Sequence, residues 1–157
     1  MEEKLAELYN KLANQIIDII PAEWDNVYYL GEVEKGKLSS GSVFYFKDIE
    51  NTIVLQCHKI PEVYQVSKNI YMDLFIKLDD TLLEIYDCFI ENGQEPWEQL
   101  SLYFNETGEF KIEFFYDVME NSKGAFQREI VWAYQTFEYM PEEGSYEKQI
   151  LEEYLKE

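Results

Sequence analysis

The chain has 157 residues, of which 46% are apolar and 17% aromatic, and this composition excludes an intrinsically disordered protein. Its 32 acidic residues against 13 basic ones give a formal net charge of −19. Such a charge excludes binding to nucleic acid and to anionic membranes, because Lys and Arg provide the affinity for phosphates.

The first part of the chain is predicted to form one helix and two or three strands. Leucines and isoleucines at spacings of three and four predict an amphipathic helix over residues 3–20, which Pro21 ends. A strand is expected over 26–34, and a turn containing Gly and Ser leads into a second strand over 42–47. A weaker alternation indicates a third strand over 52–58.

The second part contains the longest predicted helix and the clearest hairpin. A helix is expected from the N-cap at Ser67 to about Glu91, with an apolar face that includes Cys88. Two alternating runs, 100–104 and 110–116, predict a β-hairpin. Residues 124–139 favour a helix, with a strand as the alternative, and a short acidic helix is expected over 145–156.

These elements predict the fold class. Their order, with strands grouped in adjacent pairs and helices between the groups, is typical of an α+β protein. We expect an antiparallel sheet packed on one face by helices, in a single domain that spans residues 1–157. No repeat or long linker divides the chain.

The sequence offers no constellation that predicts catalysis or a bound cofactor. It has one histidine, His58, and neither a nucleophile elbow nor a glycine-rich phosphate loop. Cys57 precedes His58, but neighbours in a strand point to opposite faces and cannot act as nucleophile and base. Asp73, Asp79 and Asp80 are predicted to lie on a solvated helix face, with a carboxylate metal site as the less favoured alternative. We therefore expect no enzyme, no metal and no cofactor.

The termini and cysteines indicate a cytoplasmic protein. The N-terminus is acidic and lacks the apolar run of a Sec signal peptide. No segment approaches the length of about 20 apolar residues that a membrane-spanning helix requires. The two cysteines have neither metal-ligand spacing nor a disulfide-rich pattern.

One segment concentrates the negative charge. Between Glu84 and Glu120 there are ten acidic residues and one basic residue, Lys111. Carboxylates at this density favour encounter with a cationic protein surface, although solubility is a comparable explanation. The residues predicted to contact a partner are Asp87, Glu91, Glu95, Glu98, Glu109 and Glu113.

Several short motifs resemble the YezG/EsaG-like family of immunity proteins. The likeness runs from about residue 3 to residue 155 and is weakest over 35–60. The motifs are, in chain order, Glu3-Lys4-Leu5, Leu8-Tyr9-Asn10, Ile20-Pro21-Ala22-Glu23-Trp24, Gly93-Gln94-Glu95-Pro96-Trp97 and Thr107-Gly108-Glu109-Phe110-Lys111. The two motif tryptophans are interpreted as core anchors rather than partner contacts.

The resemblance implies a function that agrees with the charge. Family members are cytoplasmic antitoxins of Firmicutes that neutralise the nuclease domain of a toxin exported by the type VII secretion system. The hypothesis is that the acidic face occupies the basic substrate groove of that domain, while distortion of the nuclease from another surface is the alternative mechanism. An acidic adaptor for a non-toxin partner is the main competing function, and a metal hydrolase is the weaker one.

Overall fold

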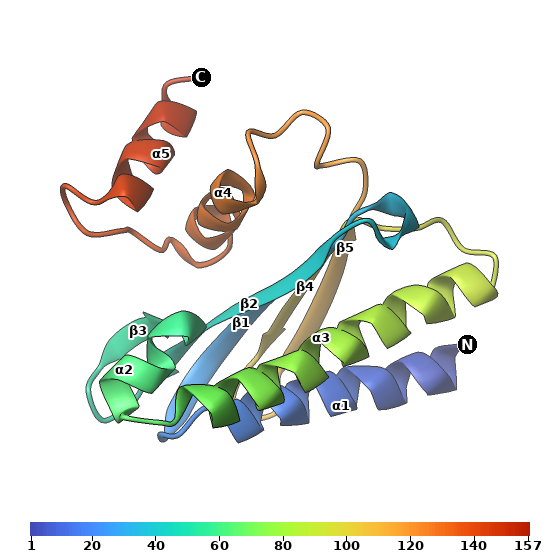
Figure 1. Ribbon diagram of the computed structural model, residues 1–157, viewed down its shortest axis with the longest axis horizontal. Coiled ribbons are helices and arrows are strands. Elements are labelled where there is room, and N and C mark those ends of the chain that lie inside the picture. Colours follow the sequence, from blue (N-terminus) through green and yellow to red (C-terminus); the bar gives the residue numbers. More distant parts are fainter. The chain divides into compact units, whose positions relative to one another are not determined.

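Five strands pair into one antiparallel sheet in the order β3-β2-β1-β4-β5 (Figure 1). The computed structural model describes residues 1–157, and it confirms the predicted α+β class. The strands lie close to the predicted ranges, and their bounds are β1 Trp24–Val33, β2 Ser40–Asp48, β3 Ile53–Gln56, β4 Gln99–Phe104 and β5 Phe110–Phe115.

Two long helices lie side by side on one face of the sheet (Figure 1). These are α1, Glu2–Ile19, and α3, Lys68–Glu91, which correspond to the two strongest helix predictions. Ser67 caps α3, as predicted, because its hydroxyl accepts a hydrogen bond from the backbone N–H of Ile70 at 3.4 Å.

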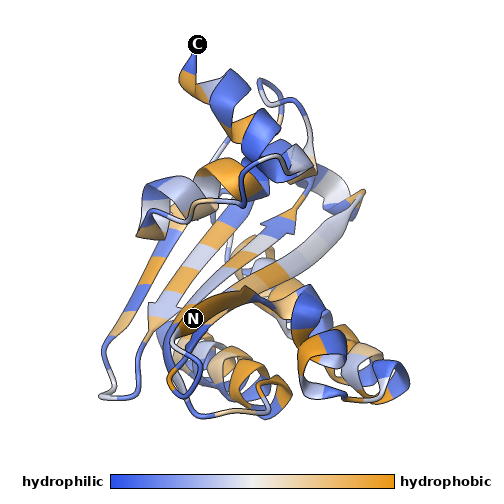
Figure 2. Ribbon diagram, turned by 90° about the vertical axis from the view of Figure 1, so that its left-hand side faces the viewer, coloured by the Kyte–Doolittle hydropathy of each residue, from blue (hydrophilic) through white to orange (hydrophobic).

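Alternation along the strands places the core between the sheet and these helices. On the central strand β1, Val27, Tyr29 and Val33 share the helix-covered face and are fully buried. The next strand β4 adds Leu100 and Leu102 to the same face. Figure 2 shows this pattern as bands of alternating hydropathy along the strands. Both cysteines are buried and neither forms a disulfide, and the burial of Cys88 agrees with its predicted place on the apolar face of the long helix.

Glycine is required at one position of the central strand. A Cβ added to Gly31 would lie 2.5 Å from Cδ1 of Leu82 on α3 and 2.8 Å from the hydroxyl of Tyr29. The absence of a side chain therefore lets α3 approach the middle of the sheet.

The segment after β3 differs from the prediction. The expected strand covers residues 52–58, but β3 ends at Gln56, and a 3₁₀ turn over Cys57–Lys59 leads into a short helix, α2, Ile60–Tyr64. The side chain of Gln56 accepts the backbone N–H of His58 at 2.9 Å, and Pro61 lies in the first turn of α2, where its missing N–H costs nothing. These local interactions end the strand early.

The buried carboxylate of Asp48 fixes the turn between β2 and β3. It accepts hydrogen bonds from the backbone and side-chain nitrogens of Asn51 at 3.1 and 2.9 Å and from the hydroxyl of Tyr64 at 2.5 Å. Desolvation acts to raise the pKa of Asp48, but the hydrogen bonds from Tyr64 and Asn51 lower it below the ordinary value.

We expect Asp48 to make stability depend on pH under acidic conditions. Because the pKa is lower in the folded state, the stabilisation is complete above the unfolded-state pKa of about 3.9 and is lost as the pH falls through the folded-state pKa. Urea unfolding of the wild type and of Asp48→Asn between neutral and acidic pH measures this effect. The gap in stability between the two proteins should narrow below about pH 4, and a gap that stays constant with pH contradicts the assignment.

Residues 117–157 form a compact unit separate from residues 1–116. This unit contains α4, Ala125–Phe137, and α5, Tyr146–Leu155, so the helical prediction for 124–139 is confirmed over its strand alternative. The prediction that residues 1–157 behave as one immunity-protein-like domain stays a prediction. None of the helices has the length and apolarity needed to cross a membrane.

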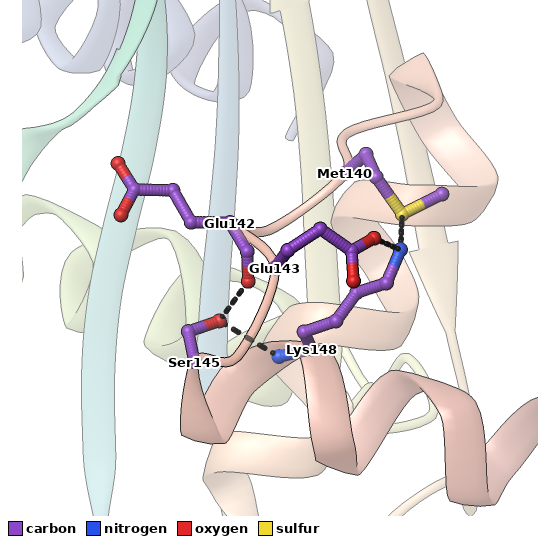
Figure 3. A network of polar contacts seen from close by, with 5 residues as sticks. All are labelled: Met140, Glu142, Glu143, Ser145 and Lys148. Carbon is purple, nitrogen blue, oxygen red and sulfur yellow. Dashed lines mark hydrogen bonds and ion pairs between the residues drawn. The ribbon is translucent and has the colours of Figure 1, made fainter.

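A local polar network starts α5 (Figure 3). The hydroxyl of Ser145 accepts the backbone N–H of Lys148 at 3.1 Å and donates to the carbonyl of Glu142 at 2.6 Å. The ammonium group of Lys148 lies 3.3 Å from the carboxylate of Glu143 and 2.8 Å from the sulfur of Met140. The loop between the two helices is thus tied to the first turn of α5.

Candidate partner-binding surface

The six predicted contact residues do not lie on one surface. Asp87 and Glu91 belong to the last turns of α3, and Glu95 follows in the exposed loop before β4. These three are close in the chain and flank the same helix end. The other three are carried by the β4–β5 hairpin, whose geometry separates them.

The hairpin residues differ in both exposure and position. Glu98 is 6% exposed, and its backbone N–H donates to the carbonyl of Phe115 in the sheet. Glu109 lies in the turn at the opposite end of the hairpin, about seven residues or roughly 23 Å along the strand from Glu98. Glu113 lies opposite Ser101, on the sheet face away from α3, and pairs with Lys111 at 3.0 Å. The six residues therefore do not form one continuous face, and their role as partner contacts stays a prediction.

A longer acidic stripe follows the outer side of α3 and is missing from the sequence-based prediction. Its acidic residues recur at spacings of seven, four, three and four, so they line one side of the helix. We call this set the α3 stripe, and it consists of Asp73, Asp80, Glu84, Asp87 and Glu91. It extends for about 27 Å along the helix axis. Repetition of acidic residues at helical spacing over all of residues 73–91 is the signal that could have identified it.

Few cations oppose the α3 stripe. Lys77 is the one basic residue at the same helical spacing. Lys11 pairs with Glu84 at 3.1 Å, and Lys37 pairs with Asp87 at 2.9 Å. Both pairs are about half exposed, so each stabilises the fold by less than about 1 kcal/mol.

The end of α3 increases the negative potential. Asp73, Asp80 and Glu91 are exposed and form no ion pair within the chain. The last turn of α3 contains no basic residue, so the partial negative charge of the helix C-terminus is not compensated there. Glu91 and Glu95 lie at this end. The stripe therefore presents several exposed carboxylates that have no cationic partner within the chain.

Asp79 is half-buried and does not belong to the stripe, so the predicted solvated position is wrong for this residue. Its Oδ1 atom is buried without a hydrogen-bond partner. Desolvation raises the pKa of Asp79, a hydrogen bond from Ser42 acts in the opposite direction, and the charge of Asp80 raises the pKa further. Ser42 also lies 2.6 Å from the hydroxyl of Tyr29. Asp79 is thus part of a polar contact between α3 and the sheet.

Cys57 and His58 were expected in a strand, but they lie in a turn and contact neighbouring elements. Both lie in the 3₁₀ turn after β3, where Cys57 accepts the backbone N–H of Phe44 at 3.5 Å and the Nδ1 atom of His58 lies 3.1 Å from the hydroxyl of Tyr71. No group of three or more His, Cys, Asp or Glu side chains is arranged to hold a metal ion. The exposed carboxylates of α3 are therefore the main chemical feature of this part of the chain.

Comparison with known proteins identifies similar immunity proteins. The model of the family "Immunity protein YezG-like" matches residues 5–151. The chain is 37% identical to immunity protein YezG of Bacillus spizizenii over 154 residues, which cover 98% of this chain and 94% of the relative. It is 35% identical to the type VII secretion system protein EsaG of Staphylococcus aureus over 162 residues, which cover 99% and 96%. It is 28% identical to immunity protein YezG of Bacillus subtilis, with coverage of 96% and 99%.

Proposed function

Since the chain belongs to the YezG-like family of immunity proteins, we propose that it is an antitoxin that neutralises the nuclease domain of a cognate secreted toxin. Proteins of this family act by binding rather than by catalysis. The relative from Staphylococcus aureus carries the name of a type VII secretion system protein, which supports a toxin exported by that route.

The exposed α3 stripe is the observation that supports a nuclease as the target. A nuclease must present Lys and Arg side chains to hold the phosphates of its substrate. The carboxylates of the stripe can occupy such positions in place of phosphates, and the net charge of −19 accelerates the encounter. Neutralisation then follows because the substrate cannot enter a groove that the antitoxin fills.

Charge reversal of two stripe residues and of Glu95, in the loop that follows the stripe, tests this proposal. The variant Asp80→Lys/Glu91→Lys/Glu95→Lys changes three exposed carboxylates that make no ion pair in the chain. We expect its association rate with the toxin domain encoded by the neighbouring gene to fall about ten-fold or more at low ionic strength. Stopped-flow kinetics at low and high salt, with a nuclease assay on the same samples, measure the loss.

A matched variant separates a local effect from a change in total charge. Glu50→Lys/Glu106→Lys/Glu109→Lys alters three exposed carboxylates in turns away from α3 by the same total charge. We expect this variant to keep most of the wild-type rate. Equal rates for both triple variants would reject the stripe as the contact surface. Absence of any binding to the toxin domain by the wild type would reject the antitoxin function and favour the adaptor.

A further inference from the structure

The outer strand β5 is hydrogen-bonded to β4 on one side, and its other edge has no neighbouring strand. It has six residues, contains no proline and pairs with β4 without a break in register. Natural edge strands are commonly protected by shortness, bulges or proline. The other edge strand, β3, has four residues and meets the first of these conditions. By contrast, Phe110 and Phe115 on β5 are 44% and 37% exposed.

The hydrogen-bonding pattern shows which residues of β5 face the free edge. The backbone N–H of Asn105 donates to the carbonyl of Glu109 at 3.2 Å. Bonded positions alternate along an antiparallel ladder, so every second residue after Glu109 directs its backbone groups toward β4. Phe110, Ile112 and Phe114 are the intervening residues, and their N–H and C=O groups point outward.

The sequence of these residues is complementary to itself. Residues 110–114 read Phe-Lys-Ile-Glu-Phe. When this strand is laid antiparallel against a second copy about Ile112, Phe110 lies opposite Phe114 and Lys111 lies opposite Glu113. In this arrangement the backbone groups of Phe110, Ile112 and Phe114 form the hydrogen bonds between the two strands. The register that pairs Lys111 with Glu113 therefore also aligns the backbone donors and acceptors.

We propose that β5 is a self-association surface through which two copies of this chain pair their sheets edge to edge. The two-fold axis passes between the two Ile112 residues, which makes the contact isologous and closed. The alternative registers shifted by two residues place Lys111 opposite Lys111, or Glu113 opposite Glu113, and like charges in directly opposite positions repel. The central register is therefore the favoured one.

The side chains on both faces of the strand support a second copy as the occupant. Lys111 and Glu113 are 70% and 49% exposed and already lie 3.0 Å apart within one strand. In the dimer, Lys111 and Glu113 of one copy lie beside Glu113 and Lys111 of the other, so that positive and negative side chains alternate on one face of the sheet. On the other face Phe110 covers Phe114 of the second copy, which extends the aromatic cluster of Phe114, Phe89 and Trp97.

Salt distinguishes this contact from the proposed toxin contact. Each copy carries a net charge of −19, so the two copies repel one another at long range. Added salt screens that repulsion more than it weakens the hydrogen bonds and apolar contacts of the strand pair. Dimerisation of the purified chain should therefore strengthen with moderate salt, whereas binding to a cationic partner should weaken.

Complementary single variants test the register directly. Lys111→Glu alone places Glu opposite Glu twice, and Glu113→Lys alone places Lys opposite Lys twice. We expect each to weaken self-association about ten-fold or more, as measured by sedimentation velocity over a concentration series. A mixture of the two variants should form a heterodimer with near wild-type affinity, because each introduced or native glutamate of one chain then faces a lysine of the other. The double variant should likewise restore the homodimer.

Controls and decisive outcomes follow from the same measurement. Lys68→Glu and Glu50→Lys make the same changes in charge at exposed positions outside β5 and should leave the dimer unchanged. Circular dichroism of each variant verifies the fold. A wild-type chain that stays monomeric at every concentration and salt level overturns the proposal. So does a dimer whose affinity is equal in both single variants and the wild type. Neither result bears on toxin binding, which is measured separately.

Discussion

Replacement of Trp97 by Ala is expected to lower the free energy of unfolding by about 4 kcal/mol, among the largest effects of any single substitution in this chain. The indole is 0% exposed and packs against the end of α3 and against β5. Its ring centroid is 5.3 Å from that of Tyr86, 6.1 Å from that of Phe89 and 5.4 Å from that of Phe114. Truncation to a methyl group leaves a cavity among these rings. Urea unfolding followed by circular dichroism measures the loss.

The variant Trp97→Phe provides the matched control. The Nε1 atom of Trp97 is buried without a hydrogen-bond partner, so an unsatisfied donor disappears with the indole. Phenylalanine retains most of the aromatic contacts. We therefore expect Trp97→Phe to lose less than half of the stability that Trp97→Ala loses. Equal losses in the two variants would contradict the packing explanation.

Replacement of Gly31 by Val is expected to lower the free energy of unfolding by about 3 kcal/mol. Even a Cβ at this position approaches Cδ1 of Leu82 to 2.5 Å, and Leu82 is 0% exposed, so its side chain cannot turn out into solvent to relieve the contact. The added side chain must push α3 away from β1 or shift the central strand. Chemical denaturation gives the magnitude, and a loss below about 0.5 kcal/mol would show that the contact relaxes without strain.

A double-mutant cycle separates steric strain from strand propensity. Leu82→Ala alone should cost about 2–5 kcal/mol because it leaves a cavity under the sheet. In the double variant, the valine at position 31 occupies part of the space that Leu82 leaves. We therefore expect the double variant to be more stable than the sum of the single effects predicts. Simple additivity would contradict direct contact as the cause.

The regular elements were predictable because their periodicity is strong. The apolar positions of α1 and α3 recur at helical spacing over many turns, and those of the β4–β5 hairpin alternate on both sides of a short turn. The strand predicted over 52–58 is confirmed over 53–56, but its predicted end at residue 58 is wrong because the alternation there is short. There, a side-chain cap from Gln56 and the following Pro61 determine the backbone, and neither produces a periodic signal.

The candidate surface was predicted only in part because density of charge along the chain is a poor guide to proximity in space. Glu98 and Glu109 belong to the acidic segment of the sequence, but the hairpin buries the first and places the second at its far end. The α3 stripe includes Asp73 and Asp80, which lie before that segment and are not among the six predicted contact residues. Position on a helix, rather than local abundance, decides which carboxylates act together.

The two sides of α3 impose different demands on its sequence. Phe75, Leu78 and Leu82 are buried, whereas Asp73, Asp80 and Glu91 on the outer side of the helix are exposed. Because the helical repeat interleaves these positions, a point substitution on the outer side changes the charge pattern without disturbing the packing beneath. The outer side of α3 can therefore change its charge pattern stepwise while the buried side that holds the helix to the sheet stays the same.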